Sequence, residues 1–307
     1  MNLQRRLIQQ FALVFVVANV TTTVRIKADI VAFAEPSYPR IGYLQTSGGS
    51  PNYLTTYPTF SPNFLAYDSV GNLYSTQAGM SGGNSSIYKV TPSGAKSVFA
   101  NVSGATSLEG LAYDRANNVL YAAAYSDGLI ARITMDGAAS TFVSGVPNPF
   151  QLAVDSSGNV FSSNLAAGTI SKITPSGTVS TFASGFYQPA SLTIDASDTL
   201  VVKGSYYFWK ITPDGTKTSW LPINPRESNP QQIAFDSTGN LWVADADNYS
   251  IWKVDSAGTK TTVLDTSYFS NRGIAVYAPV PEPSTYAMAL AGLGCGGYSI
   301  WRRRRAR

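Results

Sequence analysis

Residues 233–245 have the sequence IAFDSTGNLWVAD, and the architecture of the whole chain follows from this pattern. An apolar run ends at Asp236, the turn-forming residues Ser237 to Asn240 follow, and a second apolar run begins at Leu241. Short runs rich in β-branched and aromatic residues, separated by a glycine-containing turn, are typical of two strands joined by a tight connection. The pattern therefore predicts a β-hairpin.

The same pattern recurs along the chain. Its opening run stands at 65–68, 111–114, 152–155, 192–195 and 233–236, with aspartates that are 46, 41, 40 and 41 residues apart. Each unit continues with a third run in which apolar and polar residues alternate, as in Ser250 to Asp255, and then with a glycine turn and a fourth run. Each repeat thus predicts four short strands. We expect the repeated aspartates to cap their turns.

Four short strands repeated every ~40 residues are typical of a β-propeller, in which each blade must stack on its neighbours. Beyond the five full repeats, one run remains at the C-terminal end, 274–277, and three remain at the N-terminal end, 29–34, 41–46 and 53–56. We therefore predict an all-β, six-bladed β-propeller over residues 29–279, closed by three N-terminal strands and one C-terminal strand.

The two ends of the chain have the pattern of export signals. Arg5 and Arg6 precede the apolar run 7–20, which predicts a signal peptide over residues 1–28. At the other end, an apolar run from Tyr286 to Trp301 precedes the arginine cluster 302–305. Sixteen residues make a helix of roughly 24 Å, which predicts a short C-terminal transmembrane helix with the arginines held in the cytoplasm.

The C-terminal segment 280–307 resembles the PEP-CTERM sorting signal of Gram-negative bacteria. The resemblance rests on the apolar run, the arginine cluster and four sorting residues, Val280, Pro281, Glu282 and Pro283. It implies recognition by an exosortase-type membrane protease and a location at the cell surface or outside the cell, with at least transient anchoring in the membrane. An ordinary C-terminal anchor is the alternative.

Charge and composition exclude several functions. Nine of the 22 basic residues lie before Asp29 or after Glu282, whereas all 18 acidic residues lie between these two positions inclusive, so the exported body carries about −5. This charge argues against nucleic acid as a partner. The chain has no histidine, and its one cysteine, Cys295, lies in the apolar tail. Chemistry that needs a histidine or a thiol in the body is therefore excluded.

The repeats also resemble the NHL-repeat and gluconolactonase-like six-bladed propellers, through 233–236, 239–245 and 251–254. In the gluconolactonase-like family a divalent metal lies over the central channel, held by a glutamate, an asparagine and an aspartate. The resemblance implies Glu109, Asn164 and Asp245 as the matching residues, with Ca²⁺ as the metal suited to such oxygen ligands. The family's fuller motifs around the glutamate and the asparagine are absent.

Polar residues that differ between blades are the candidates for ligand binding. They occur at the end of each second strand and at the start of each first strand, and among them we predict ligand contacts from Glu35, Gln77, Glu109, Asn164 and Asp245. The second-strand positions are Glu35, Gln77, Ala124, Asn164, Gly204 and Asp245. The first-strand positions are Asn63, Glu109, Gln151, Ser191, Gln232 and Arg272.

Two functions remain open, together with a purely structural role as a spacer. The first is a non-enzymatic binding module at the cell surface or in the extracellular matrix, with surface polysaccharide as a candidate ligand. The second is a metal-dependent lactonase or related hydrolase that uses Glu109, Asn164 and Asp245, with a carboxylate as the base.

Overall fold

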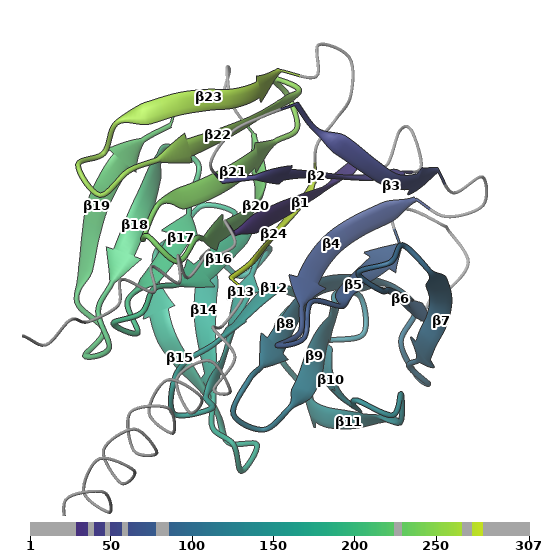
Figure 1. Ribbon diagram of the computed structural model, residues 1–307. Coiled ribbons are helices and arrows are strands. Elements are labelled where there is room, and N and C mark those ends of the chain that lie inside the picture. The colour runs from purple at the N-terminus through teal and green to yellow at the C-terminus, as the bar shows by residue number, and fades with distance from the viewer. Residues whose placement is uncertain are drawn as a thin grey trace, which may run out of the picture.

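The computed structural model describes residues 29–35, 40–46, 50–56, 61–77, 86–223, 229–265 and 272–278. These residues form six four-stranded antiparallel sheets arranged around one axis, as the propeller prediction requires (Figure 1). The predicted signal peptide, the four sorting residues and the predicted transmembrane helix lie outside the described residues. Within the described ranges, no helix has the length and apolar character needed to cross a membrane.

The blades are numbered in chain order, and the strands of each blade are named from the innermost to the outermost. The first blade contains β4 (Pro62–Tyr67), β5 (Leu73–Gln77), β6 (Ser86–Val90) and β7 (Lys96–Asn101). The second contains β8 (Leu108–Asp114), β9 (Val119–Ala124), β10 (Leu129–Thr134) and β11 (Ala139–Ser144). The third contains β12 (Pro149–Val154), β13 (Val160–Asn164), β14 (Thr169–Ile173) and β15 (Val179–Ser184).

The remaining blades follow the same plan. The fourth contains β16 (Ser191–Ile194), β17 (Leu200–Lys203), β18 (Tyr207–Ile211) and β19 (Lys217–Pro222). The fifth contains β20 (Pro230–Phe235), β21 (Leu241–Asp245), β22 (Ser250–Val254) and β23 (Lys260–Asp265). The sixth contains β24 (Gly273–Tyr277), β1 (Ile30–Glu35), β2 (Arg40–Gln45) and β3 (Asn52–Thr56).

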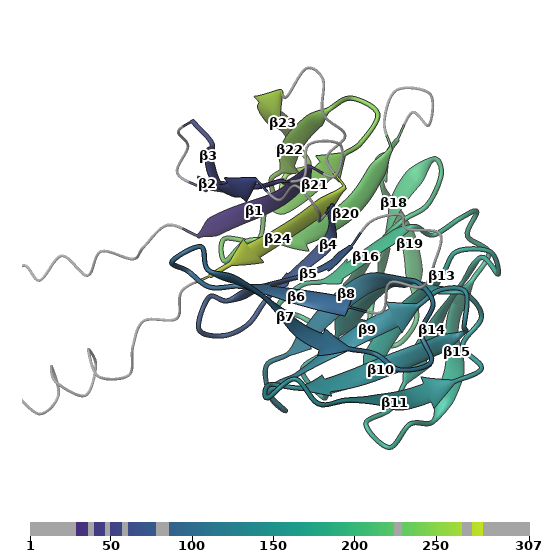
Figure 2. The same ribbon diagram turned by 90° about the vertical axis from the view of Figure 1, so that its right-hand side faces the viewer.

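The sixth blade closes the ring. β1 pairs antiparallel with β24 over five residues, from Ile30 opposite Tyr277 to Ala34 opposite Gly273, and on its other edge with β2. The two strands lie side by side in both views (Figures 1 and 2), although more than 240 positions of sequence separate Ile30 from Tyr277. The innermost strands then contact one another in the cyclic order β4, β8, β12, β16, β20, β24 and back to β4. The predicted closure is confirmed.

Apolar packing lies between the blades rather than within them. The buried apolar side chains form six clusters, and each cluster joins one pair of neighbouring blades. Trp242 of the fifth blade, for example, packs with Phe33 and Ile274 of the sixth. Trp209 and Trp252, which recur at one position of the third strands, also pack in these clusters. Because a single sheet cannot cover both of its faces, each blade depends on two neighbours.

The repeated aspartates cap the turns that connect the first and second strands. Asp236 Oδ1 accepts hydrogen bonds from the Thr238 and Asn240 backbone N–H groups, at 3.0 and 2.9 Å, and its Oδ2 accepts one from Trp242 Nε1 at 2.8 Å. Equivalent bonds are present at Asp68, Asp114, Asp155 and Asp195. The prediction that these residues are structural is confirmed.

Gln232 of β20 ties three blades together. Its side-chain Oε1 accepts hydrogen bonds from the backbone N–H groups of Leu65 and Ile274, both at 3.0 Å, and its Nε2 donates to the Leu65 carbonyl at 2.8 Å. The side chain is buried. Because these backbone groups belong to β4 and β24, Gln232 supports the part of the ring where the two ends of the chain meet.

We predict that Gln232→Ala lowers the free energy of unfolding by about 3 kcal/mol, because buried backbone groups of β4 and β24 lose their partner. Urea denaturation followed by tryptophan fluorescence measures this loss. The control is Gln231→Ala, since this neighbouring, partly exposed side chain bonds only Asn229 among the contacts described, at 2.8 Å. We expect the control to lose less than about 1 kcal/mol; equal losses in the two variants would contradict the proposed role.

Candidate functional site at the channel mouth

One end of the ring gathers most of the side chains that differ between blades. In an antiparallel blade the start of the first strand and the end of the second strand lie at the same end of the sheet. We call this end of the propeller the mouth face. Four of the innermost strands, β4, β8, β12 and β20, carry one extra residue near their start, which shifts the register against the neighbouring strand. Such bulges re-aim side chains and are frequent next to binding sites.

Glu109 lies on β8 at one of these bulges. Its Oε2 accepts a hydrogen bond from Asn63 Nδ2 at 3.1 Å, and its Oε1 accepts one from Ser107 Oγ at 3.2 Å. Burial raises the pKa of this carboxyl above its ordinary value of 4.5, and the bonds from Ser107 and Asn63 and the charge of Arg272 oppose that rise only in part. The structure therefore brings together three predicted positions from three blades, Asn63, Glu109 and Arg272.

The innermost strands also carry buried polar atoms that lack a partner within the described residues. These atoms are Asn63 Oδ1, Gln151 Oε1 and Ser191 Oγ. All three residues are buried and stand at the first-strand positions that the sequence indicates as candidates for ligand binding. Since an unpaired buried polar atom is costly, groups of this kind are usually satisfied by ordered water or by a ligand.

Aromatic rings pack in the same region. Phe64 of β4 and Phe150 of β12 meet edge to face at 5.3 Å between centroids, although the second blade separates their blades in the ring. Tyr125, from the turn after β9, contacts Phe150 at 6.0 Å. Gly110 of β8 allows the backbone of Phe150 to lie close to β8, because a Cβ at this position would lie 2.5 Å from the Phe150 carbonyl oxygen.

The other two residues implied as metal ligands are occupied within their own blades. Asn164 Nδ2 donates to Thr169 Oγ1 at 2.9 Å and to Ser171 Oγ at 2.8 Å. Asp245 is fully buried and accepts hydrogen bonds from the Asn229 backbone at 2.9 Å, Asn248 Nδ2 at 3.0 Å and Trp252 Nε1 at 3.2 Å. Both side chains stabilise the connection between a second and a third strand, and in the described ranges no cluster of three acidic, histidine or cysteine side chains is present that could hold a metal.

Glu35 and Gln77 occupy the equivalent positions of the sixth and first blades. Glu35 is fully buried and forms an ion pair with Arg40 across the β1–β2 hairpin. Burial raises the pKa of the Glu35 carboxyl, and Arg40 opposes this rise. Arg40 in turn lies over the Tyr53 ring, 3.9 Å from its centroid. Gln77 ends β5, where it is partly exposed and pairs in register with Pro62.

Exposed tyrosines form a further feature of the mouth face, and nothing in the repeat pattern singles them out. Tyr187 lies in the loop between β15 and β16 and is 68% exposed, and Tyr206 lies in the turn after β17 and is 62% exposed. Ser205 Oγ donates to the Tyr187 carbonyl at 3.2 Å, so the two loops are joined. Tyr207, also exposed, packs against Trp209. We call Tyr187, Tyr206 and Tyr207 the tyrosine platform.

Comparison with known proteins supports the sorting signal and the fold. Residues 279–305 match the PEP-CTERM protein-sorting motif. Such a motif indicates export and membrane-anchored sorting in Gram-negative bacteria, with processing by an exosortase-type membrane enzyme. No curated protein matches the chain.

Several solved structures share the propeller. A chain of the nidogen/laminin complex matches with a TM-score of 0.70 and 18% identity, over 83% of the present chain and 100% of its own. A streptogramin B lyase matches with a TM-score of 0.64 and 17% identity, over 80% and 83%. A protein of unknown function from Bacteroides caccae matches with a TM-score of 0.60 and 12% identity, over 81% and 99%. At these identities the similarity establishes the fold alone.

The raised pKa of Glu109 gives a prediction for stability. Between pH 4.5 and the raised value, the folded protein holds a proton that the unfolded chain has lost, so the free energy of unfolding falls as pH rises through this window. Glu109→Gln removes this fall. We expect its stability relative to the native protein to increase as pH rises above 4.5 and to be constant at lower pH, measured by urea denaturation across the pH range. A constant difference at all pH values would show that burial does not raise this pKa.

Proposed function

We propose that this protein is a non-enzymatic binding module that is exported and then holds a carbohydrate polymer on its mouth face, at the cell surface or in the extracellular matrix. The match to a sorting motif at 279–305 supports export. The main support for a binding role is the tyrosine platform. Its large rings are exposed to water, and a hydrogen bond connects the loops that carry Tyr187 and Tyr206.

Tyrosine is well suited to contact with sugars. Its ring offers an apolar face to the C–H groups of a sugar ring, while its hydroxyl remains free to exchange hydrogen bonds with sugar hydroxyls. Tyr249, from the turn after β21, adds another exposed ring on the mouth face of the next blade. Rings carried by neighbouring blades suit an extended polymer better than a small molecule enclosed in a pocket.

The polar groups of the mouth face also favour binding over catalysis. The side chains of Asn164 and Asp245 form hydrogen bonds within their own blades, and these bonds stabilise the connections between the second and third strands. Some of the structural neighbours are lyases, including a catalytically inactive histidine-to-alanine form of virginiamycin B lyase with a TM-score of 0.59 and 15% identity. Since the present chain contains no histidine, it has no residue of that type for such chemistry.

We predict that Tyr187→Ala and Tyr206→Ala each weaken binding of the producing cell's own exopolysaccharide about two- to tenfold, because a stacked ring contributes roughly 0.5–1.5 kcal/mol beyond its buried area. Titration calorimetry with the purified exported protein measures the change. Val98→Ala is the control, since Val98 is 52% exposed on the outer strand β7, away from the platform. Unchanged affinity in both tyrosine variants would reject the platform as the binding surface.

The alternative is a metal-dependent lactonase or related hydrolase, with Ca²⁺ held by Glu109, Asn164 and Asp245. One observation favours it, the raised pKa of Glu109 in a polar channel, because shifted carboxyl groups are frequent among catalytic acids and bases. This function requires Asn164 and Asp245 to exchange their present hydrogen bonds for contacts with the metal.

Metal analysis of the purified protein and a lactone hydrolysis assay separate the two functions. For the binding module we expect no stoichiometric metal and no turnover. For the hydrolase, Glu109→Gln and Asp245→Asn lose both the metal and at least about a hundredfold in kcat, as expected when a catalytic carboxylate is removed. Turnover that depends on Glu109 would therefore overturn the binding proposal.

A further inference from the structure

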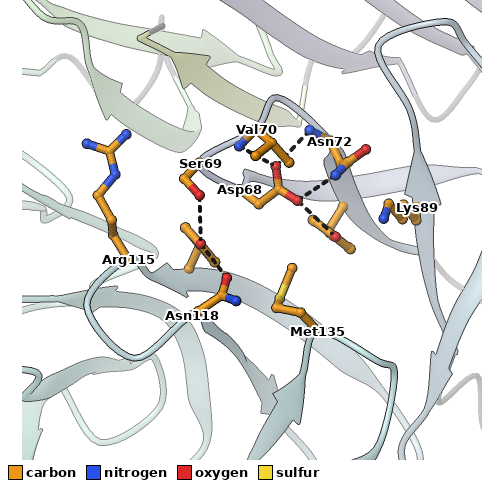
Figure 3. Close-up of a pocket in the computed structure, with 10 residues that line it drawn as sticks. Asp68, Ser69, Val70, Asn72, Lys89, Arg115, Asn118 and Met135 are labelled. Carbon is orange, nitrogen blue, oxygen red and sulfur yellow. Dashed lines mark hydrogen bonds between the residues drawn. The ribbon is translucent and has the colours of Figure 1, made fainter. Parts of the chain in front are cut away.

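A cleft separates the first and second blades at the end of the ring opposite the mouth face. It has a volume of about 460 Å³ and is lined by the turn between β4 and β5, the turn between β8 and β9, and the side chains of Lys89 and Met135 (Figure 3). Two cations line it, Lys89 and the exposed Arg115. Within the described part of the chain, neither forms an ion pair with an acidic side chain.

At the equivalent position in two other blades, a carboxylate of the protein itself is bound. In the third blade, Ser156 follows the capping aspartate, and its backbone N–H donates to Asp198 Oδ1 of the fourth blade at 2.9 Å, while its hydroxyl donates to Asp198 Oδ2. In the fifth blade, the N–H of Ser237 donates to Asp29 Oδ2 of the sixth blade at 2.6 Å. A serine at this turn position therefore binds a carboxylate from the following blade.

Ser69 is the corresponding serine of the first blade, but no carboxylate of the second blade meets it. Among the described residues, its backbone N–H has no acceptor, and its hydroxyl lies 3.2 Å from the Tyr113 hydroxyl. That hydroxyl donates to Asn118 Oδ1 at 2.7 Å, as the dashed lines through Ser69 and Asn118 show (Figure 3). The neutral Asn118 stands directly before the second strand, as Asp29 does in the sixth blade.

The nearby Asp68 does not prevent an anion from binding here. Its carboxylate accepts hydrogen bonds from the N–H groups of Val70 and Asn72, from Asn72 Nδ2 and from the Tyr74 hydroxyl, at 2.7 to 3.1 Å. The equivalent aspartates of the third and fifth blades, Asp155 and Asp236, stand beside the same kind of bound carboxylate. Two carboxylates therefore lie close together at two other turns of this kind in the ring.

We propose that the cleft between the first and second blades binds the carboxylate of an acidic sugar unit, a uronate, in a polysaccharide. The carboxylate accepts hydrogen bonds from the Ser69 N–H and hydroxyl groups, and Arg115 and Lys89 supply the compensating charge. The Asn118 amide and the Tyr113 hydroxyl meet sugar hydroxyls, while Val70 and Met135 provide apolar contact. This site deepens the proposed function and rests on it, since it specifies the class of polymer that the protein holds.

The test compares three probes by titration calorimetry on the purified exported protein: tetragalacturonate, the neutral galactose tetramer of the same linkage, and a tetraglutamate peptide. We expect tetragalacturonate to bind most tightly. Arg115→Ala and Ser69→Ala should each weaken its binding about tenfold or more, because hydrogen bonds to charged groups are strong. Asn118→Asp, which places a negative charge beside Ser69, should abolish binding without loss of folding.

Ser156→Ala is the matched control, because its position is already filled by Asp198, and we expect it to bind tetragalacturonate as the native protein does. Equal affinity of the native, Arg115→Ala and Asn118→Asp proteins for tetragalacturonate would overturn the proposal that the cleft is the binding site. If, in addition, the neutral tetramer bound and depended on Tyr187, the proposed function would stand while this site failed. If tetraglutamate bound more tightly than tetragalacturonate and the same substitutions weakened its binding, the sugar ligand would be rejected and an acidic peptide would be the ligand.

Discussion

The pairing of β1 with β24 is the interaction on which the rest of the structure depends. Every buried cluster lies between two blades, so a ring with one open seam would expose two apolar faces to water. The seam is joined by backbone hydrogen bonds between strands from the two ends of the propeller, and Gln232 reinforces it from a third blade. Stability and the geometry of both candidate surfaces therefore have a common origin.

The two ends of the ring present different chemistry. The mouth face combines buried, unpartnered polar atoms in the channel with exposed tyrosines on the loops around it. The opposite end contains the short, aspartate-capped turns of five blades. The turn of the first blade lacks the bound carboxylate that its counterparts in the third and fifth blades have. In both places one blade differs from its equivalents, whereas the shared features are needed by every blade.

Much of the fold could be predicted from the sequence, because the strands and turns of each repeat follow from residues that are close together in the chain. The spacing of the repeats then gives the number of blades. The role of the capping aspartates was predictable for the same reason. The candidate site was harder. Glu109 was among the positions predicted for ligand binding, and that role stays a prediction. The hydrogen bonds that Asp245 accepts from Asn229 and Trp252 do not follow from the repeat pattern. The absence of a carboxylate beside Ser69 is recognised only when the blades are compared in space. Exposure of Tyr187 and Tyr206 depends on loop packing, which the periodic pattern does not encode.

Ile30 stands opposite Tyr277, so the polypeptide enters and leaves the propeller at one end, the end that lies away from the mouth. The sorting motif begins two positions beyond Tyr277. The chain therefore continues toward its sorting motif from the end of the ring that carries the serine cleft, whereas the tyrosine platform lies at the other end. Proteolytic removal of the sorting segment would therefore change the chain next to the serine cleft and leave the tyrosine platform untouched.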